Sequence, residues 1–333
     1  MHLKSVFLFV FLIVTIVIAD TSNERRTKLV IDNDAGGDDA VAIFLALLYE
    51  KHFDGPSLIG LTTGNGNTAE ENVCHNNQRI LKVANRQDVP IYRGSKSSLV
   101  STPVTTNYYG KDGLGDCDLY KTDLVPVNEQ SAVSALIELS KKHEGNLKVI
   151  TLGALTNVAL AIKLDPNFLS RLQQLYVAAG HIHDENNPDV EFNASVDIEA
   201  YHIVTQYATP DKVTIFPFSQ VKRYLNLTRT WRLEVLGKID TDIIKAMNVF
   251  EQVPMMHSER WQALDPAAVA VVVNPDLVDE YKYSKNGIIT CGEKRGTNTN
   301  EFVAKEDANV KVIYSVKEDK YREFLLNVFS KSL

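Results

Sequence analysis

The sequence predicts a single α/β domain, an open and mostly parallel central sheet flanked by helices, with a Rossmann-like core. Two observations support this fold class. Apolar runs of strand length alternate along the chain with longer segments of helical periodicity. The composition, 44% hydrophobic and 23% charged residues among 333, is that of a globular protein long enough to bury a sizeable core.

Polar and glycine-rich segments separate the expected elements. Asp265 and Pro266 should start a helix, with the aspartate as N-cap and the proline in the first helical position. We expect strands at residues 29–31, 57–63, 89–92, 147–152, 175–179 and 213–218, and further strands after residue 277. We expect helices at residues 40–48, 70–84, 131–143, 197–207 and 232–250, a helix ending at residue 164, and a helix at the C-terminus.

The segment from Lys28 to Tyr49 combines a short apolar run, a turn with two glycines and a long apolar run. The turn and its borders carry four aspartates, Asp32, Asp34, Asp38 and Asp39. The glycines permit a tight connection from strand to helix. The aspartates should therefore gather at the carboxyl end of the first strand, where open α/β sheets place their ligands.

Four carboxylates that close together repel one another and raise each other's pKa values. Hydrogen bonds from loop amides and the helix N-terminus could relieve this repulsion. A hard divalent cation could also do so, since calcium and magnesium both bind carboxylate oxygens. The alternative is a solvated aspartate-rich turn, which the buried character of the flanking segments disfavours.

Residues 1–19 are typical of a secretory signal peptide, with Lys4 before an apolar stretch and a small residue, Ala19, before the expected cleavage site. Residues 20–27 then form a short N-terminal extension. This pattern predicts a secreted, extracellular protein. Its three cysteines could form one disulfide and leave one thiol free.

The net charge is −7, and loss of Lys4 with the leader would make it about −8. An acidic chain disfavours nucleic acid and anionic membranes as partners. It is compatible with a small neutral ligand. Two glycosylation sequons occur, at Asn193 and Asn226.

The motifs of this chain resemble those of the inosine–uridine-preferring nucleoside hydrolases over residues 27–330. The most specific motif is D-x-D-x-G-x-D-D at residues 32–39, with Ala35 where the family usually has proline. Five weaker motifs follow in the family's order: Gly66-Asn67-Thr68 with Asn76 downstream, Gly110-x-Asp112-Gly113-Leu114-Gly115, Leu155-Thr156-Asn157, Glu191-Phe192-Asn193, and Asp265-Pro266-x-Ala268-Val269. Residues 28–333 would then be the catalytic domain of a secreted member.

The resemblance implies a Ca²⁺-dependent enzyme that hydrolyses the N-glycosidic bond of ribonucleosides to ribose and a purine or pyrimidine base. Calcium would be bound by Asp34, Asp39, Asp265 and the backbone carbonyl of Leu152. Asp32 would orient the loop from behind these ligands. A homodimer or homotetramer is expected.

The resemblance also implies how the ribose is held. Asp38, Asn67, Asn193 and Asp265 would bind the 2′- and 3′-hydroxyls, and Glu191 the 5′-hydroxyl. Bond cleavage builds an oxocarbenium-like positive charge on the sugar, which carboxylates stabilise. Asp34 would activate a calcium-bound water that attacks C1′, acting as general base.

The base side departs from the family pattern. Leu264 stands where one subgroup has histidine and another tryptophan, and Ala178 stands where methionine often lines the sugar pocket. Tyr109 lies at a base-stacking position of relatives, and His257 and Trp261 lie just upstream of Asp265. We expect these three residues on the base side, with Arg260, His181 and His183 as further candidates, and we expect at least one of the six to contact the base. The base preference is left open.

Two other functions compete with this interpretation. A phosphatase of the haloacid dehalogenase type also has an Asp-x-Asp motif after a buried strand, but it needs Thr or Val where this chain has Gly36. A secreted nucleoside-binding protein could keep the ribose site and lack turnover, and the residues Leu264 and Ala178 are compatible with that alternative.

Overall fold

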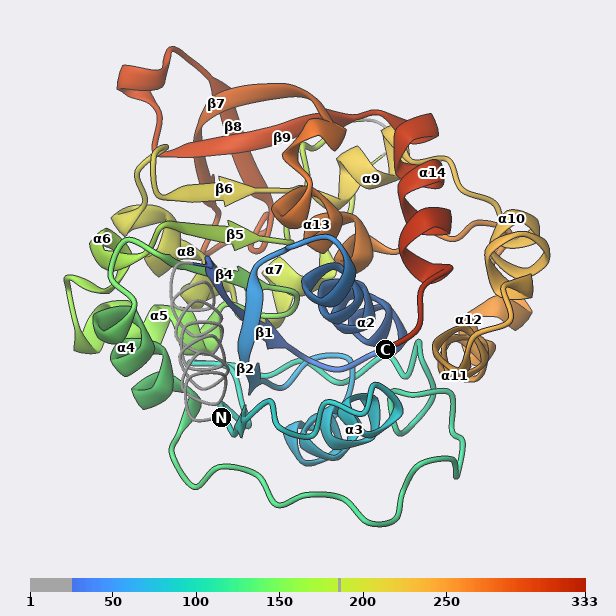
Figure 1. The fold of residues 1–333 in the computed structure, drawn as a ribbon. Helices are drawn as coiled ribbons and strands as arrows, with labels where there is room; N and C mark the ends of the chain where they lie inside the picture. Colours follow the sequence, from blue (N-terminus) through green and yellow to red (C-terminus); the bar gives the residue numbers. More distant parts are fainter. Residues whose placement is uncertain (1–25, 185–186) are drawn as a thin grey trace, which may run out of the picture.

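A nine-stranded sheet runs through the computed structural model, which describes residues 26–184 and 187–333 (Figure 1). The strands are β1 (Lys28–Asn33), β2 (Ser57–Thr63), β3 (Ile91–Tyr92), β4 (Leu147–Thr151), β5 (Gln174–Val177), β6 (Val213–Ile215), β7 (Val278–Ile288), β8 (Asn298–Phe302) and β9 (Val310–Val316). Their order is β3-β2-β1-β4-β5-β6-β9-β7-β8. All pairs from β3 to β9 are parallel, whereas β7 is antiparallel to both β9 and β8. The predicted fold class is confirmed.

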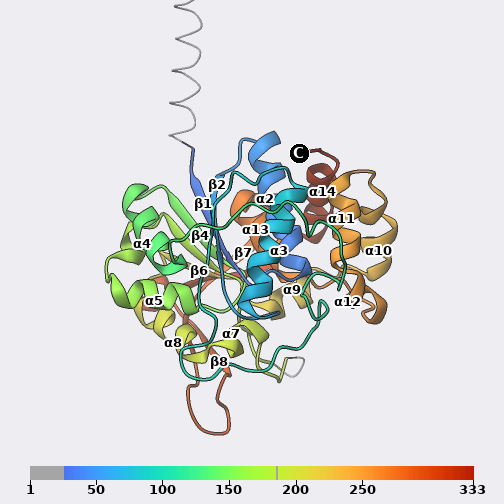
Figure 2. The same ribbon diagram turned by 90° about the horizontal axis from the view of Figure 1, so that it is seen from below.

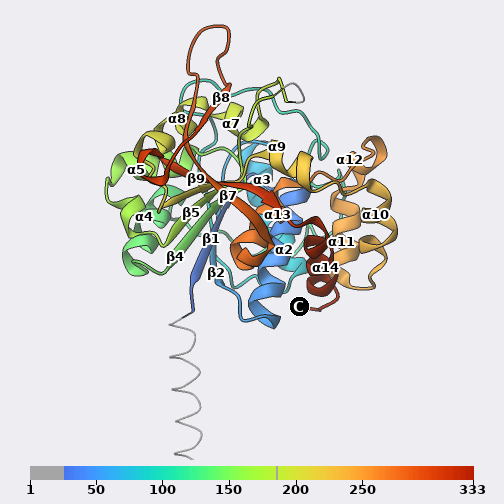
Figure 3. The ribbon, with the colours of Figure 1, turned by 90° about the horizontal axis from the view of Figure 1, so that it is seen from above.

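Helices cover both faces of the sheet. The α-helices are α2 (Gly37–His52), α3 (Glu70–Val83), α4 (Ala132–Lys142), α5 (Thr156–Leu164), α6 (Phe168–Arg171), α7 (Phe192–Val196), α8 (Ile198–Tyr207), α9 (Phe218–Tyr224), α10 (Arg229–Glu234), α11 (Asp242–Phe250), α12 (Gln252–His257), α13 (Leu264–Val273) and α14 (Glu318–Phe329). Short 3-10 helices lie at Leu236–Lys238, Pro275–Leu277 and Lys305–Asp307. Helices α4, α5 and α8 lie on one face, and α2, α13 and α14 on the other (Figures 2 and 3).

The central strand β1 faces both hydrophobic layers. Leu29 and Ile31 belong to the core shared with α2 and α13, and Val30 belongs to the core shared with α5 and α8. This two-sided burial explains why β1 is a continuous apolar run. Helix α2 is buried along most of its length, which explains why its apolar residues do not form a single stripe.

Several predicted boundaries are corrected by the structure. The expected helix at 232–250 is two α-helices, because the chain is interrupted around Gly237 and restarts where Thr241 caps α11. The expected strand at 213–218 ends at Ile215, since Pro217 is the N-cap of helix α9, which begins at Phe218. The strand expected at 89–92 is limited to β3, because Pro90 lacks a backbone donor.

The predicted helix start at Asp265 is wrong in register. Helix α13 begins at Leu264 with Ala263 as N-cap, so Asp265 lies inside the first helical turn. Pro266 is tolerated there because first-turn amides have no intrahelical acceptor. The Asp265 carboxylate is directed toward other carboxylates and does not cap the helix, as described below.

Two segments project from this framework. The β7–β8 hairpin extends at the end of the molecule where α7 lies (Figure 3). The segment 94–127, expected to be irregular, has no helix or strand of its own and wraps around the edge near α3 (Figure 2).

Among the residues described, no helix combines the length and hydrophobicity that a membrane span requires. Cys74, Cys117 and Cys291 are all free thiols.

Candidate active site

The turn between β1 and α2 folds around the Asp39 carboxylate. The backbone amide of Gly36 donates to Asp39 Oδ2 at 2.7 Å, and that of Asp34 donates to Oδ1 at 3.3 Å. Ala35 adopts φ = +34°, which is uncommon for a residue with a Cβ. At Gly36 and Gly37, an added Cβ would lie 2.7 Å from the Tyr109 ring. Glycine is therefore required here for close packing.

Asp34 is held by the loop that follows β2. The Asn67 backbone amide donates to Asp34 Oδ2 at 2.8 Å, and the Asn67 side-chain amide donates to Oδ1 at 3.0 Å. Backbone from two loops approaches the same carboxylate, because a Cβ at Gly66 or Gly153 would collide with Asp34. Asp34 is thus held by hydrogen bonds from the loop after β2 and is closely approached by the loop after β4.

Asp32 lies behind this layer. It accepts hydrogen bonds from the Thr62 hydroxyl at 2.5 Å and the Asn157 side-chain amide at 2.8 Å. Asn157 also donates to the Thr63 carbonyl at 2.9 Å, so it joins β1 to the end of β2. These contacts hold the turn in place without exposing Asp32 to a ligand.

Helix α13 completes a cluster of acidic groups. Asp38, Asp39 and Asp265 each offer a carboxylate oxygen, and these atoms all lie within 4.8 Å of one another. All three residues are buried, and Asp38 Oδ1 has no hydrogen-bond partner among the described residues. A buried, unpartnered carboxylate oxygen is costly unless a ligand or cation meets it.

The electrostatics of the cluster favour a cation. Burial raises the pKa of Asp34 to about 6 and that of Asp38 to about 7. Burial, followed by the charges of the neighbouring aspartates, raises the pKa of Asp39 and Asp265 well above the usual range. Full ionisation of these four aspartates near neutral pH therefore needs a positive charge among their carboxylate oxygens.

Calcium ligands are oxygens, and the site offers carboxylates and a backbone carbonyl. The Leu152 carbonyl, at the end of β4, accepts from the Asn193 side-chain amide at 2.7 Å, and the same amide donates to the Ala178 carbonyl at 2.9 Å. Asn193 thus reaches the ends of two central strands. The donor set and the unpartnered Asp38 oxygen fit a hard divalent cation.

Glu191 closes the opposite side of the site as N-cap of α7. Its two carboxylate oxygens accept backbone amides from Gly180 at 2.7 Å, Ala194 at 2.9 Å and Asn193 at 3.0 Å. Burial raises its pKa, and these three hydrogen bonds oppose that rise. Glu191 therefore fixes the loop that presents Asn193.

The three residues expected on the base side have different environments. Tyr109 is buried and its hydroxyl hydrogen-bonds to Asp38. Trp261 is buried, and its indole N–H donates to Glu251 Oε1 at 2.7 Å. His257, the last residue of α12, is exposed.

Glu251 is a neighbour of the site that the sequence analysis missed. It is buried, pairs with Arg232, and lies so close to α2 that a Cβ on Gly37 would be 3.0 Å from its Cγ. No local pattern could have revealed it, because its partners Arg232 and Trp261 lie 19 and 10 residues away on other elements.

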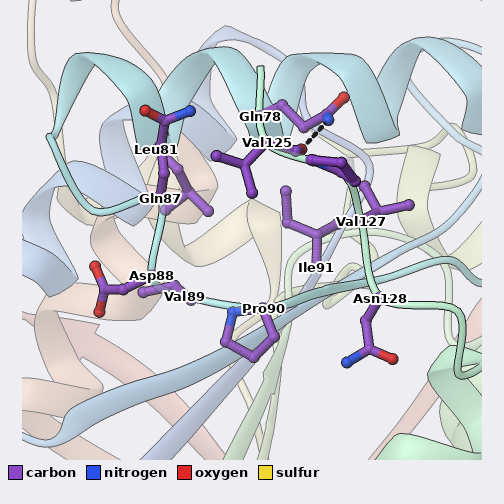
Figure 4. Close-up of a pocket in the computed structure, with 11 residues that line it drawn as sticks. Gln78, Leu81, Gln87, Asp88, Val89, Pro90, Ile91, Val125, Val127 and Asn128 are labelled. Carbon is purple, nitrogen blue, oxygen red and sulfur yellow. Dashed lines mark hydrogen bonds between the residues drawn. The ribbon is translucent and has the colours of Figure 1, made fainter. Parts of the chain in front are cut away.

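A separate surface pocket of about 240 Å³ lies between α3, β3 and residues 125–128 (Figure 4). Ile91, Val125 and Val127 contribute apolar walls, and the Gln78 side chain donates to the Val125 carbonyl. None of its lining residues belongs to the acidic cluster. The candidate active site is therefore the acidic cluster and not this pocket.

Comparison with known proteins assigns the family. The sequence model of the family described as "Inosine-uridine preferring nucleoside hydrolase" matches residues 29–323. The chain belongs to this family. It is therefore a nucleosidase, an enzyme that hydrolyses N-glycosyl compounds.

Individual nucleoside hydrolases agree with this assignment. The inosine-uridine preferring nucleoside hydrolase of Crithidia fasciculata is 31% identical over 75% of this chain and 80% of the relative. Uridine nucleosidase 1 of Arabidopsis thaliana is 34% identical over 76% of each chain. The solved structure of an inosine-guanosine nucleoside hydrolase has TM-score 0.80 and 23% identity, covering 92% of this chain and 99% of that chain. A purine-preferring ribonucleoside hydrolase from Gardnerella vaginalis also has TM-score 0.80, at 25% identity over 91% and 98%.

Proposed function

We propose that this nucleoside hydrolase is a secreted, calcium-dependent enzyme that splits ribonucleosides into ribose and a free purine or pyrimidine base. The observation that carries the proposal is the convergence of buried carboxylates from helices α2 and α13, with oxygens of Asp38, Asp39 and Asp265 within 4.8 Å of one another. The relatives, which are named for inosine, uridine and purine nucleosides, support this substrate class.

Asp34, Asp39, Asp265 and the carbonyl of Leu152 would hold the calcium ion. Carboxylate and carbonyl oxygens are the ligands that calcium prefers, and the raised pKa values of these aspartates indicate a site that gains from a cation. When bound, calcium would lower the pKa of the nucleophilic water and anchor the ribose diol.

The ribose would be bound by side chains from four segments. Asp38, Asn67, Asn193 and Asp265 would contact the 2′- and 3′-hydroxyls, and Glu191 the 5′-hydroxyl. The backbone hydrogen bonds to Glu191 and those of Asn193 to the ends of β4 and β5 support this role, because they hold both side chains in fixed positions. A fixed sugar brings C1′ toward the attacking water at low entropic cost.

Asp34 would act as general base. Its two hydrogen bonds from Asn67 orient the carboxylate. A carboxylate that contacts both the metal and the attacking water can accept the proton of that water. The surrounding carboxylates would stabilise the positive charge that develops on the ribose as the N-glycosidic bond breaks. Tyr109, Trp261 and His257 would lie on the base side.

The decisive experiment is ribose release from inosine, adenosine, uridine and cytidine. The wild-type protein should release ribose, and chelation or the changes Asp34→Ala and Asp39→Asn should abolish both the activity and bound calcium. Asp242→Asn, an exposed change on α11, is the matched control and should have no effect. Full activity in the chelated protein would refute the metal assignment, and nucleoside binding without ribose release would indicate a binding protein.

Secretion and assembly are part of the proposal. The residues expected to form the signal peptide, 1–19, and residues 20–25 of the extension lie outside the described residues. Mass spectrometry of the mature protein should find a chain that begins near Asp20, and one that begins at Met1 would contradict secretion by cleavage. Sedimentation should show a homodimer or homotetramer. Binding assays with nucleic acid and with membranes should show no association.

A further inference from the structure

The aromatic side chains near the acidic cluster differ in how much ring surface they leave free. Tyr109 is 8% exposed, and its ring packs on Gly36 and Gly37. Trp261 is 3% exposed, and its N–H is engaged by Glu251. Both rings are therefore already covered by protein, and little of either remains to cover a flat heterocycle.

Tyr108 is the exception. It is 52% exposed, although its ring centroid lies 4.9 Å from that of Tyr109, at an interplanar angle of 85°. An edge-to-face contact of this kind is a stable arrangement that leaves a ring face free. Tyr108 is thus held in place by a neighbour that itself hydrogen-bonds to Asp38.

A second contact holds Tyr108 from the other side of the site. Its side chain hydrogen-bonds to Ser258, which follows directly after His257 at the end of α12. Tyr108 directly precedes Tyr109, whose ring packs on Gly36 and Gly37, so it lies beside the cluster and not at a remote part of the segment 94–127. Two elements therefore fix the position of an exposed ring next to Asp38.

We propose that Tyr108 provides the surface on which the nucleobase stacks and so determines specificity, with Tyr109 as the support that orients it. This inference rests on the proposed nucleosidase function, because it assumes that a ribose bound at the acidic cluster directs its base toward Tyr108. Stacking on an aromatic ring accepts any base, since every base has a π-face. A purine covers more of the ring than a pyrimidine, so purine nucleosides should depend on Tyr108 more strongly.

The test compares Tyr108→Ala, Tyr108→Phe and the remote control Tyr207→Ala, which removes a 45% exposed tyrosine at the C-terminal end of α8. We measure kcat/KM for inosine and uridine, and inhibition by free ribose as a probe that has no base. Tyr108→Ala should lower kcat/KM by roughly five- to a hundredfold, more for inosine than for uridine, because stacking contributes on this scale. Ribose inhibition should stay unchanged, since ribose makes no stacking contact.

The Phe variant separates stacking from the hydrogen bond to Ser258. Tyr108→Phe should retain the ranking of inosine and uridine, because the ring is kept, and Tyr207→Ala should behave as wild type. Equal losses for inosine, uridine and ribose in Tyr108→Ala would overturn the inference, as would no loss for either nucleoside. Both outcomes leave the nucleosidase function standing, provided that wild type releases ribose. If wild type does not release ribose, the binding of inosine, uridine and ribose to the same variants is measured by calorimetry. Equal losses of affinity for all three in Tyr108→Ala, or no loss for either nucleoside, would again overturn the inference.

Discussion

The buried ion pair between Arg232 and Glu251 gives a quantitative test of how the site is supported. Arg232 Nε donates to Glu251 Oε2 at 2.9 Å, and both side chains are at most 1% exposed. Arg232→Met would leave the Glu251 carboxylate buried without its cation, which costs about 3–5 kcal/mol of the free energy of unfolding. For a domain of this size the loss corresponds to a fall in Tm of roughly 6–20 °C.

The second step of this test is the double variant Arg232→Met with Glu251→Gln. The glutamine oxygen can still accept from the Trp261 indole, so no buried charge remains and that hydrogen bond is kept. The double variant should recover at least about 2 kcal/mol relative to Arg232→Met. Urea unfolding at one fixed calcium concentration measures both, because a cation bound at the acidic cluster would add its own stabilisation. A single variant within about 1 kcal/mol of wild type, or a double variant worse than the single, would refute the reasoning.

Three further predictions concern the turn, the charges and the surface. The pKa values of Asp34 and Asp38 are raised to about 6 and 7, above the unfolded value of 3.8. In the metal-free protein their contribution to the free energy of unfolding is therefore present at pH 4 and lost as the pH rises through 7. Urea midpoints of the chelated protein should fall over that range, and midpoints that rise would contradict the pKa shifts. Ala35→Gly should leave stability unchanged or raise it by up to about 1 kcal/mol because φ is +34°, whereas Ala35→Pro should cost about 3 kcal/mol or more; a thermal melt in which the proline variant is the more stable would show that the turn has another conformation. Asn226 is exposed and Asn193 is buried, so glycopeptide mapping should find a glycan on Asn226 alone, and a glycan on Asn193 would be incompatible with its contacts to β4 and β5.

Local sequence patterns predicted most of the framework. The apolar runs of β1 and β2 and the helical periodicity of α3 and α4 were recognisable because burial on a sheet or helix face imposes a period. The interruption at Gly237 was not recognised, since the flanking residues keep a helical composition. The register of α13 was misjudged because the Asp265 carboxylate belongs to the acidic cluster, and a single sequence does not distinguish that use from capping.

Only some residues of the candidate site could be predicted from the sequence, because only some of them lie close together along the chain. Asp34, Asp38 and Asp39 lie in one short turn, so their proximity follows from chain geometry. Asp265 and Asn193 were added through the family resemblance, and the structure brings both to the ends of the central strands. Arg232, Glu251 and Trp261 could not be predicted as a unit, because a charged residue on a helix is indistinguishable in sequence from a solvated one.

The packing of α13 against α2 has a consequence for how the enzyme is made. The aspartates of α2 are synthesised early, but their partner Asp265 belongs to a helix that emerges only when most of the chain has been translated. Until then, the early carboxylates lack one wall of the cluster and must stay hydrated or protonated. A product that ends before residue 264 could therefore never assemble the acidic cluster, even if the first strands were paired. Completion of the site and completion of translation are coupled in this protein.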